Sequence, residues 1–403
     1  MSEANRRVAP SGVPPLLHGR RIAIVGAGPA GLTLARLLQM RGADVRVYER
    51  DASRRLRGQG GSLDLHEDSG QLALRQAGLG DAFRARARPD GQCSRILDRH
   101  AVVQFETLAE HEAQSQPEID RGALRDLLLD SLAPGTVIWD ARLDGVERAE
   151  GGGWRLAFAP GEAVQGGTAH ADLLFGCDGG WSRVRPLRSA AVPVYSGVTF
   201  VQARLVDADL RHPEIAGLVG SGSLMALGDD RALMAQRNGD GTIRVYAVLR
   251  VEESWRARDT YDWQDDARVR RDLLAQFSGW SPTLTGLLAN AEPGFERWPL
   301  YCMPAAQQWL PATGATLLGD AAHIMPPFTG RGANHAMLDA FELAQRLGSD
   351  RFASIEAALA DYESAMLARM APEIEATLAS QDLMIAPDAP AGIVAYLRGQ
   401  TGE

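Results

Sequence analysis

Three glycines near the start of the chain, Gly26, Gly28 and Gly31, have the spacing of a loop that binds the pyrophosphate of a dinucleotide. They follow a β-branched run at residues 21–25 and precede residues 31–40, in which leucines recur at helical spacing. Such a loop needs glycines because the turn is tight, the pyrophosphate approaches the backbone closely, and the helix packs near the strand. The unpaired N–H groups at the start of the helix then bind the phosphates.

An acidic residue, Glu49, supports this interpretation. It ends an alternating segment at residues 44–48 that we expect to be a second strand, and it lies 18 residues beyond Gly31. An acid at an offset of about 20 residues binds ribose hydroxyls, which favours FAD or NAD over NADP at this site. The alternative is a tight turn followed by a surface glutamate. Strand, helix and strand together form a βαβ unit, which requires a parallel sheet.

Two aspartates follow further buried strands. Asp178 comes after residues 172–177, and Asp320 comes after residues 316–319. A short segment beyond Asp320 then leads into a helix predicted at residues 334–347. Each aspartate alone could simply belong to a polar turn. The two aspartates support a cofactor site only because they occur together with the glycine loop.

The three motifs, in this order, resemble those of the group A flavin-dependent aromatic hydroxylases. Residues 48–51, 60–66, 117–121 and 319–328 are more narrowly similar to the tetracycline-inactivating flavin monooxygenases, and the similarity extends over about residues 20–380. The resemblance implies that the last aspartate contacts the ribityl chain of FAD and that the next helix N-terminus faces the flavin ring. Reduced flavin carries negative charge there, which helix N–H groups stabilise.

The resemblance also implies a set of cofactor contacts. The residues expected to contact FAD are Gly26, Gly28, Gly31, Glu49, Arg50, Asp64, Arg121, Asp178 and Asp320. Arg57 is expected to contact NADPH, or else to belong, with Arg54 and Arg55, to a solvated basic turn. No second glycine fingerprint is present, and the family needs none because NADPH docks transiently in a groove. His323 is either a proton carrier beside the flavin or a structural cap.

The substrate is expected between the flavin and an antiparallel region at residues 198–250. No side chain is expected to act as a nucleophile, because the flavin carries the reaction. The family's tetracycline-binding arginine and histidine align roughly with Ser223 and Arg244, and a phenylalanine aligns with Met234. Ser223 cannot pair with a charge as an arginine does, so this departure counts against tetracycline. The candidate pocket residues are Gln202, Arg244, Pro327 and Gly330.

Composition excludes several other functions. The 403 residues contain 42 basic side chains, all Arg, and the absence of Lys excludes a Schiff-base or P-loop lysine. A net charge of −9 argues against nucleic-acid binding. The three dispersed cysteines predict neither a metal site nor a disulfide framework, and residues 1–15 lack the apolar segment of a signal peptide. We therefore expect a cytoplasmic monomer without a membrane span.

We predict an α/β fold with a Rossmann-like FAD-binding domain of the p-hydroxybenzoate hydroxylase type, an antiparallel-sheet substrate domain and a long C-terminal helix. The FAD-binding domain is expected at residues 19–90, 115–190 and 300–347, and the substrate domain at residues 91–114 and 191–299. Residues 350–386 are expected to form a bridging helix. Residues 1–18 and 387–403 are expected to be tails.

The sequence thus predicts an FAD-dependent, NADPH-using monooxygenase. It would hydroxylate an electron-rich aromatic or enolic, polycyclic small molecule with O₂ through a C4a-hydroperoxyflavin. Tetracycline inactivation and a Baeyer–Villiger outcome remain alternatives, as does NADH in place of NADPH. From another class, the chain could be a non-catalytic flavin-carrying protein that sequesters a ligand. A flavin-dependent halogenase is set aside because the chain lacks the pocket lysine and the Trp-x-Trp-x-Ile-Pro segment of that group.

Overall fold

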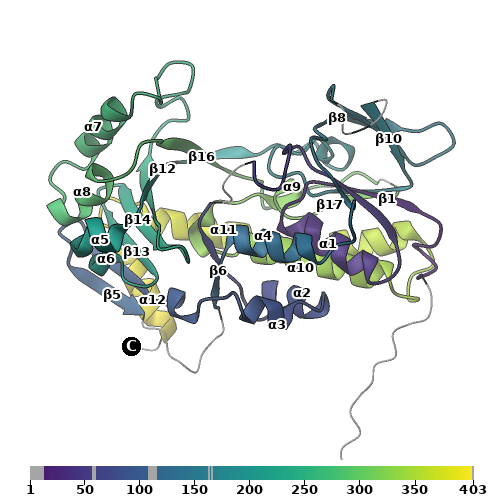
Figure 1. Ribbon diagram of the computed structural model, residues 1–403, viewed down its shortest axis with the longest axis horizontal. Helices are drawn as coiled ribbons and strands as arrows, with labels where there is room; N and C mark the ends of the chain where they lie inside the picture. Colours follow the sequence, from purple (N-terminus) through teal and green to yellow (C-terminus); the bar gives the residue numbers. More distant parts are fainter. Residues whose placement is uncertain are drawn as a thin grey trace, which may run out of the picture.

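The computed structural model of the protein describes residues 13–56, 60–107, 116–161, 164, 167–311 and 313–401. It has a part built on a parallel sheet and a part built on an antiparallel sheet, and helix α11 (Ile355–Met384) runs from one to the other (Figure 1). No described helix combines the length and the apolar character needed to cross a membrane.

The parallel-sheet part contains the predicted βαβ unit. Its strands lie in the order β17-β11-β1-β2-β7, and every neighbouring pair is parallel. Helices α1 (Pro29–Gln39), α10 (Gly332–Leu347) and α11 share one apolar core with these strands, as expected for a parallel sheet covered by helices. The strands are β1 (Arg21–Val25), β2 (Asp44–Tyr48), β7 (Val137–Ile138), β11 (Leu173–Gly176) and β17 (Ala315–Leu317).

Shorter elements complete this part. A three-stranded antiparallel sheet holds a hairpin that turns at three consecutive glycines, and a two-stranded sheet pairs β3 with β6. The elements are β3 (Ser62–Asp64), β6 (Glu118–Asp120), β8 (Leu143–Arg148), β9 (Trp154–Phe158), β10 (Thr168–Ala171), α2 (Gly70–Gln76), α3 (Gly80–Arg84), α4 (Arg121–Asp130), α9 (Asp320–His323), and the 3₁₀ turns η1 (Pro89–Gln92), η3 (Arg185–Leu187) and η4 (Pro327–Thr329).

The second part is a seven-stranded sheet in the order β16-β12-β15-β14-β13-β4-β5. All neighbours are antiparallel except β13 and β4. The strands are β4 (Ser94–Asp98), β5 (Val103–Thr107), β12 (Val194–Leu205), β13 (Ser223–Gly228), β14 (Arg231–Arg237), β15 (Ile243–Arg250) and β16 (Glu296–Cys302). The sequence analysis expected strands here but not the helices α5 (Ala208–Arg211), α6 (Pro213–Val219), α7 (Asp266–Gln276) and α8 (Pro282–Ala289).

The two faces of this sheet have different neighbours. The outer face, with Val201, Val245 and Leu233, shares an apolar core with helices α6 to α8. The inner face, with Phe200 and Val248, packs on side chains from the end of α11 and from α12 (Ala391–Thr401). Successive strand residues point to opposite faces, so the residues that alternate with the outer core must face the parallel-sheet part.

The C-terminal segment corrects one prediction. Residues 391–401 form helix α12, with Ile393 and Val394 buried, where a tail was expected. The apolar side chains of this short helix have an apolar sheet face to cover, which explains why it is folded. At the other end, Leu17 is only 1% exposed, so the predicted N-terminal tail does not extend to residue 18. Helix α11, expected at residues 350–386, is continuous through Pro372.

Candidate functional site

The glycine loop lies between β1 and α1 and is held by backbone contacts. Gly26 has a φ of +102°, and a Cβ built there would lie 2.2 Å from the carbonyl oxygen of Cys177. A Cβ on Gly31 would lie 2.0 Å from the carbonyl oxygen of Gly26. A Cβ on Gly28, in contrast, would meet no atom of the described residues within 4 Å. Two glycines are therefore required by the fold, while Gly28 leaves open space at the helix N-terminus that fits a pyrophosphate.

Glu49 lies directly beside this loop and is 5% exposed. Its two carboxylate oxygens accept hydrogen bonds from the backbone N–H groups of Ala27 (2.7 Å) and Asp51 (3.0 Å). Each oxygen has a second lone pair, so the carboxylate can still accept ribose hydroxyls. The loop and the acid thus form one unit of the kind that the spacing predicted.

Arg125, which was not among the predicted site residues, supports this unit. Arg125 is 6% exposed, its Nε donates to the carbonyl oxygen of Ala27 (3.3 Å), and its Nη2 lies 3.5 Å from Asp51 and 4.0 Å from Glu49. The sequence could have pointed to Arg125 through its position four residues after Arg121. Residues i and i+4 share one face of a helix, so both arginines should face the same way. Arg121 and Arg50 are exposed.

Asp178 stabilises its own turn. One carboxylate oxygen accepts from the hydroxyl of Ser182 (2.6 Å) and the other from the backbone N–H of Arg183 (2.7 Å). Burial raises the pKa of Asp178, and these hydrogen bonds oppose the rise. The buried Arg185 then ties this turn to the Asp320 loop, because its guanidinium donates to the carbonyl oxygens of Gly180 (2.5 Å) and Ala321 (2.8 Å).

The Asp320 loop presents an exposed carboxylate at the start of α9. Beneath it, the buried His323 and Asp339 are paired at 2.7 Å, and Asp339 also accepts from the N–H of Gly319 (2.9 Å) and pairs with Arg369. Burial would raise the pKa of Asp339, but His323 and Arg369 hold it at about 2. His323 therefore acts as the structural support of the loop in this arrangement.

Asn334, in the first turn of α10, organises the opposite wall of the site. It is fully buried; its amide nitrogen donates to the carbonyl oxygen of Asp64 (2.8 Å), and its amide oxygen accepts from the N–H groups of His66 and Gly70. A Cβ on Gly330 would lie 3.2 Å from the Asp64 carboxylate. The structure thus brings Asp64 and Gly330 together at the N-terminus of α10.

The inner face of the antiparallel sheet meets this site. Phe328, in the turn that starts at the exposed Pro327, contacts Phe200 of β12 with ring centroids 5.9 Å apart. Gln202 lies on the same face as Phe200, two residues along β12, directly opposite Tyr246 of β15. A Cβ on Gly61, in the loop before β3, would lie 3.4 Å from the Tyr246 hydroxyl.

Arg244 also belongs to the inner face. It pairs across strands with Gln236 and is partly buried, and its Nε is buried without a hydrogen bond to any described residue. Burial raises the pKa of Tyr246, while Arg121 and Arg244 oppose this rise, so both cations lie near its hydroxyl. Arg57 lies outside the described residues.

A hydrogen-bonded bridge that was not expected from the sequence joins the seven-stranded sheet to the two-stranded sheet of β3 and β6. The side-chain oxygen of Gln236 accepts from the N–H of Ser62 (3.2 Å), and its nitrogen donates to Glu118 (3.0 Å). Burial raises the pKa of Glu118 to about 7, against the effects of Gln236 and of Arg88 at 3.4 Å. This bridge fixes β14 against the segment that carries Gly61 and Asp64.

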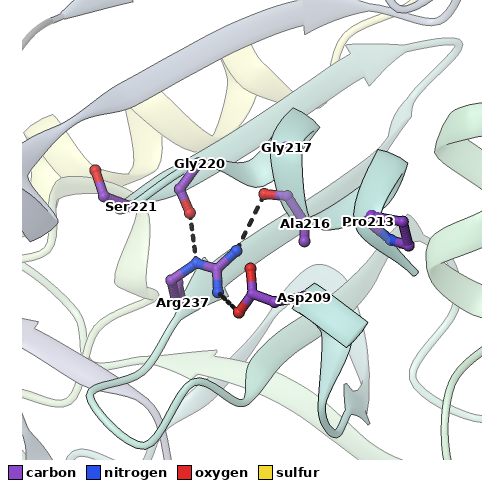
Figure 2. Close-up of a pocket in the computed structure, with 7 residues that line it drawn as sticks. All are labelled: Asp209, Pro213, Ala216, Gly217, Gly220, Ser221 and Arg237. Carbon is purple, nitrogen blue, oxygen red and sulfur yellow. Dashed lines mark hydrogen bonds and ion pairs between the residues drawn. The ribbon is translucent and has the colours of Figure 1, made fainter. Parts of the chain in front are cut away.

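A separate cleft lies on the outside of the antiparallel part. Figure 2 shows this cavity of about 470 Å³, where Arg237 is bound by Asp209 and by the carbonyl oxygens of Ala216 and Gly220. These three groups already bind the guanidinium of Arg237. None of the predicted site residues lines the cleft. The described residues contain no group of three or more His, Cys, Asp or Glu that could hold a metal ion.

Comparison with known proteins agrees with this site. Residues 20–371 match the family described as FAD binding domain. Monooxygenase penA of Penicillium thymicola is 34% identical over 370 residues, which cover 81% of this chain and 84% of that protein. Among solved structures, Klebsiella pneumoniae HpxO complexed with FAD and uric acid has a TM-score of 0.77 at 21% identity, covering 96% of this chain and 94% of its own. Tetracycline destructase Tet(51) has a TM-score of 0.69 at 16% identity, covering 95% and 94%.

The structural similarities establish the fold, and the sequence matches establish the family. The matched range contains the glycine loop, Asp178, Asp320 and the inner sheet face, so it spans both parts of the molecule. The chain belongs to the FAD binding domain family, that of the group A FAD-dependent aromatic monooxygenases.

Proposed function

We propose that the protein uses NADPH and O₂ to hydroxylate an electron-rich aromatic or enolic, polycyclic small molecule on bound FAD. One O atom enters the substrate and the other leaves as water: substrate–H + NADPH + H⁺ + O₂ gives substrate–OH + NADP⁺ + H₂O. The observation that carries the proposal is the inner sheet face with Gln202 and Tyr246 against the Gly61, Asp64 and Gly330 segments.

In this proposal the parallel-sheet part holds the cofactor. Gly28 leaves room for the pyrophosphate, Glu49 accepts the adenosine ribose hydroxyls, and the exposed carboxylate of Asp320 accepts the ribityl hydroxyls. Arg50, Arg121 and Asp178 complete the proposed set, Asp178 through the turn that it stabilises. When bound, FAD supplies the hydride acceptance and oxygen activation that amino-acid side chains cannot provide.

The inner sheet face would orient the substrate. Hydroxylation by an electrophilic oxygen needs a nucleophilic carbon, as found next to a phenolate or enolate oxygen. Arg244 can stabilise that anion through a charge-assisted hydrogen bond, worth roughly 1.5–3 kcal/mol. Gln202 can donate to a second oxygen, and the apolar residues of the face exclude water.

The central test uses the purified protein and its Asp320→Ala variant. The wild type should be yellow with about one FAD per chain, and phenols or enols should accelerate NADPH oxidation and gain one oxygen by mass spectrometry. Asp320→Ala should fold but contain less FAD, while the exposed Asp68→Ala control should retain it. FAD-loaded protein that binds phenols without accelerated NADPH oxidation would be a sequestering protein instead.

Arg57 provides the test of the reductant. Arg57→Ala should raise the KM for NADPH severalfold while the KM for the phenol stays constant, because only the nucleotide carries the phosphates that an arginine pairs with. NADH measured in parallel checks the nucleotide preference. An unchanged KM for NADPH would make Arg57 a surface charge only.

A further inference from the structure

Four inner-face side chains form one row across the antiparallel sheet. Gln202, Tyr246, Met234 and Met225 are direct cross-strand partners on β12, β15, β14 and β13. Adjacent strands lie about 4.8 Å apart, so the row spans roughly 14 Å from Gln202 to Met225. It continues through Ile96 to Phe105 on the last two strands.

Except at Arg244, the rows on either side are held by contacts with the rest of the protein. On one side Val248, Ala232 and Leu227 are fully buried against α11 and α12. On the other side Gln236 is bound to Ser62 and Glu118, and Ser223 is 3.2 Å from the hydroxyl of Ser94. The four residues of the middle row are all partly exposed, although Tyr246, Met234 and Met225 also pack against the apolar cluster of the inner face. The part of this face left for a ligand is therefore a strip made of this row, with Arg244 beside one end of it.

The chemistry changes along this strip. At one end lie the amide of Gln202 and the hydroxyl of Tyr246. Arg244 lies two residues from Tyr246 on the same face, and its buried Nε has no hydrogen-bond partner among the described residues. At the other end Met234 and Met225 are flexible, apolar side chains that adapt to aromatic surfaces. One end can bind oxygen atoms, and the other can bind only apolar groups.

We propose that the substrate has two parts: a phenolic or enolic ring whose oxygens face Gln202, Tyr246 and Arg244, and an uncharged aryl or alkyl arm that lies over Met234 and Met225. The proposal rests on the flavin monooxygenase function and adds a substrate class to it. The ring undergoes the reaction, and the arm determines affinity. A carboxylate at the far end of the arm is excluded, because the methionines cannot replace its hydration.

Binding to the oxidised, FAD-loaded protein tests this without turnover. Calorimetry should give a Kd for 4-phenylphenol that is roughly tenfold or more below that for phenol, because the second ring is buried. 4′-Hydroxybiphenyl-4-carboxylate should bind no better than phenol. Equal Kd values for phenol and 4-phenylphenol, or tight binding of the carboxylate, would overturn the proposal.

Variants assign the two ends separately. Met225→Gln and Met234→Gln, which keep the side-chain length, should reduce the preference for 4-phenylphenol over phenol. Tyr246→Phe should weaken both ligands by the same factor. The exposed Met40→Gln is the matched control and should leave both Kd values unchanged. A preference retained in both methionine variants contradicts the assignment of the arm, whereas normal binding without substrate-stimulated NADPH oxidation contradicts only the proposed function.

Discussion

At the scale of single residues, the three glycines of the loop have three different reasons to be glycine. Gly26 has a positive φ and lies against the backbone of Cys177, and Gly31 lies against the carbonyl of Gly26. Both are constraints of the fold itself. A Cβ on Gly28 would meet none of the described residues, so we expect the constraint on this position to come from the ligand.

This difference gives a matched pair of substitutions. Gly28→Ala should leave the melting temperature close to that of the wild type and reduce bound FAD severalfold, because the methyl group occupies the space of the pyrophosphate. Gly31→Ala should lower the melting temperature of the cofactor-free protein itself, because its Cβ overlaps the carbonyl oxygen of Gly26. Thermal melts and flavin absorbance after dialysis measure both effects. Equal FAD content in Gly28→Ala and wild type would show that the open space is not the phosphate site.

At the scale of elements, the antiparallel sheet is fixed to the two-stranded sheet of β3 and β6 through β14. Gln236 and Glu118 make this connection, and the turn after β14 adds a bond from the N–H of Gly239 to Asp120 (3.0 Å). Arg88 donates to Ser62 and Asp120 within the same cluster. The position of the antiparallel sheet against β3 and β6 therefore depends on these polar groups, which lose several hydrogen bonds if one member is removed.

Glu118 should make stability depend on pH. Its pKa is raised from 4.5 to about 7 in the folded protein, so the folded state retains a proton that the unfolded chain releases. The contribution of this proton is complete below about pH 4.5 and is lost as the pH rises through about 7. Urea unfolding between pH 5 and 8.5 should show a smaller loss of stability for Glu118→Gln than for the wild type. The exposed Glu67→Gln should follow the wild type, and parallel curves for Glu118→Gln would contradict the prediction.

At the scale of the whole molecule, helix α11 packs against both the parallel sheet and the seven-stranded sheet and so connects them. Its N-terminal half packs in the core of the parallel sheet, and Met384 at its end packs on the inner face of the other sheet. On the way, Thr377 donates to the carbonyl oxygen of Pro326 (2.8 Å), and Gln381 donates to that of Ser196 (2.9 Å). Helix α12 then covers the end of the inner face.

Removal of α12 tests its role in this packing. A chain ending at Asp388 should be less stable by roughly 3–6 kcal/mol, because Ile393 and Val394 lose their burial at about 1.5–3 kcal/mol each. It should retain FAD, since the glycine loop and the Asp320 loop do not contact α12 in the apolar cores. A chain ending at Thr401 is the control. Unchanged stability after removal of α12 would mean that the helix adds nothing to the packing of the sheet.

The sequence by itself determined the cofactor-binding half of this protein. The glycine spacing, Glu49 and the strand-end aspartates are local signals, because each depends on a turn joining a strand to a helix close by in the chain. The parallel sheet followed from the same pattern, and the resemblance led to the family that the comparisons confirm. The expected roles of Asp64, Asp320 and the other site residues stay predictions.

Only the tertiary structure decided which residues meet across the two parts. The bridge from Gln236 to Glu118, the support of Asp64 by Asn334 and the row from Gln202 to Met225 join positions more than 20 residues apart. Strand register determines these contacts, because shifting the register of a strand by one residue would turn every side chain of that strand to the other face of the sheet. The sequence alone does not determine which face of the sheet Arg244 lies on. Its cross-strand pairing with Gln236 places it on the inner face. Helix α12 likewise depends on an apolar face that forms only when the sheet is assembled.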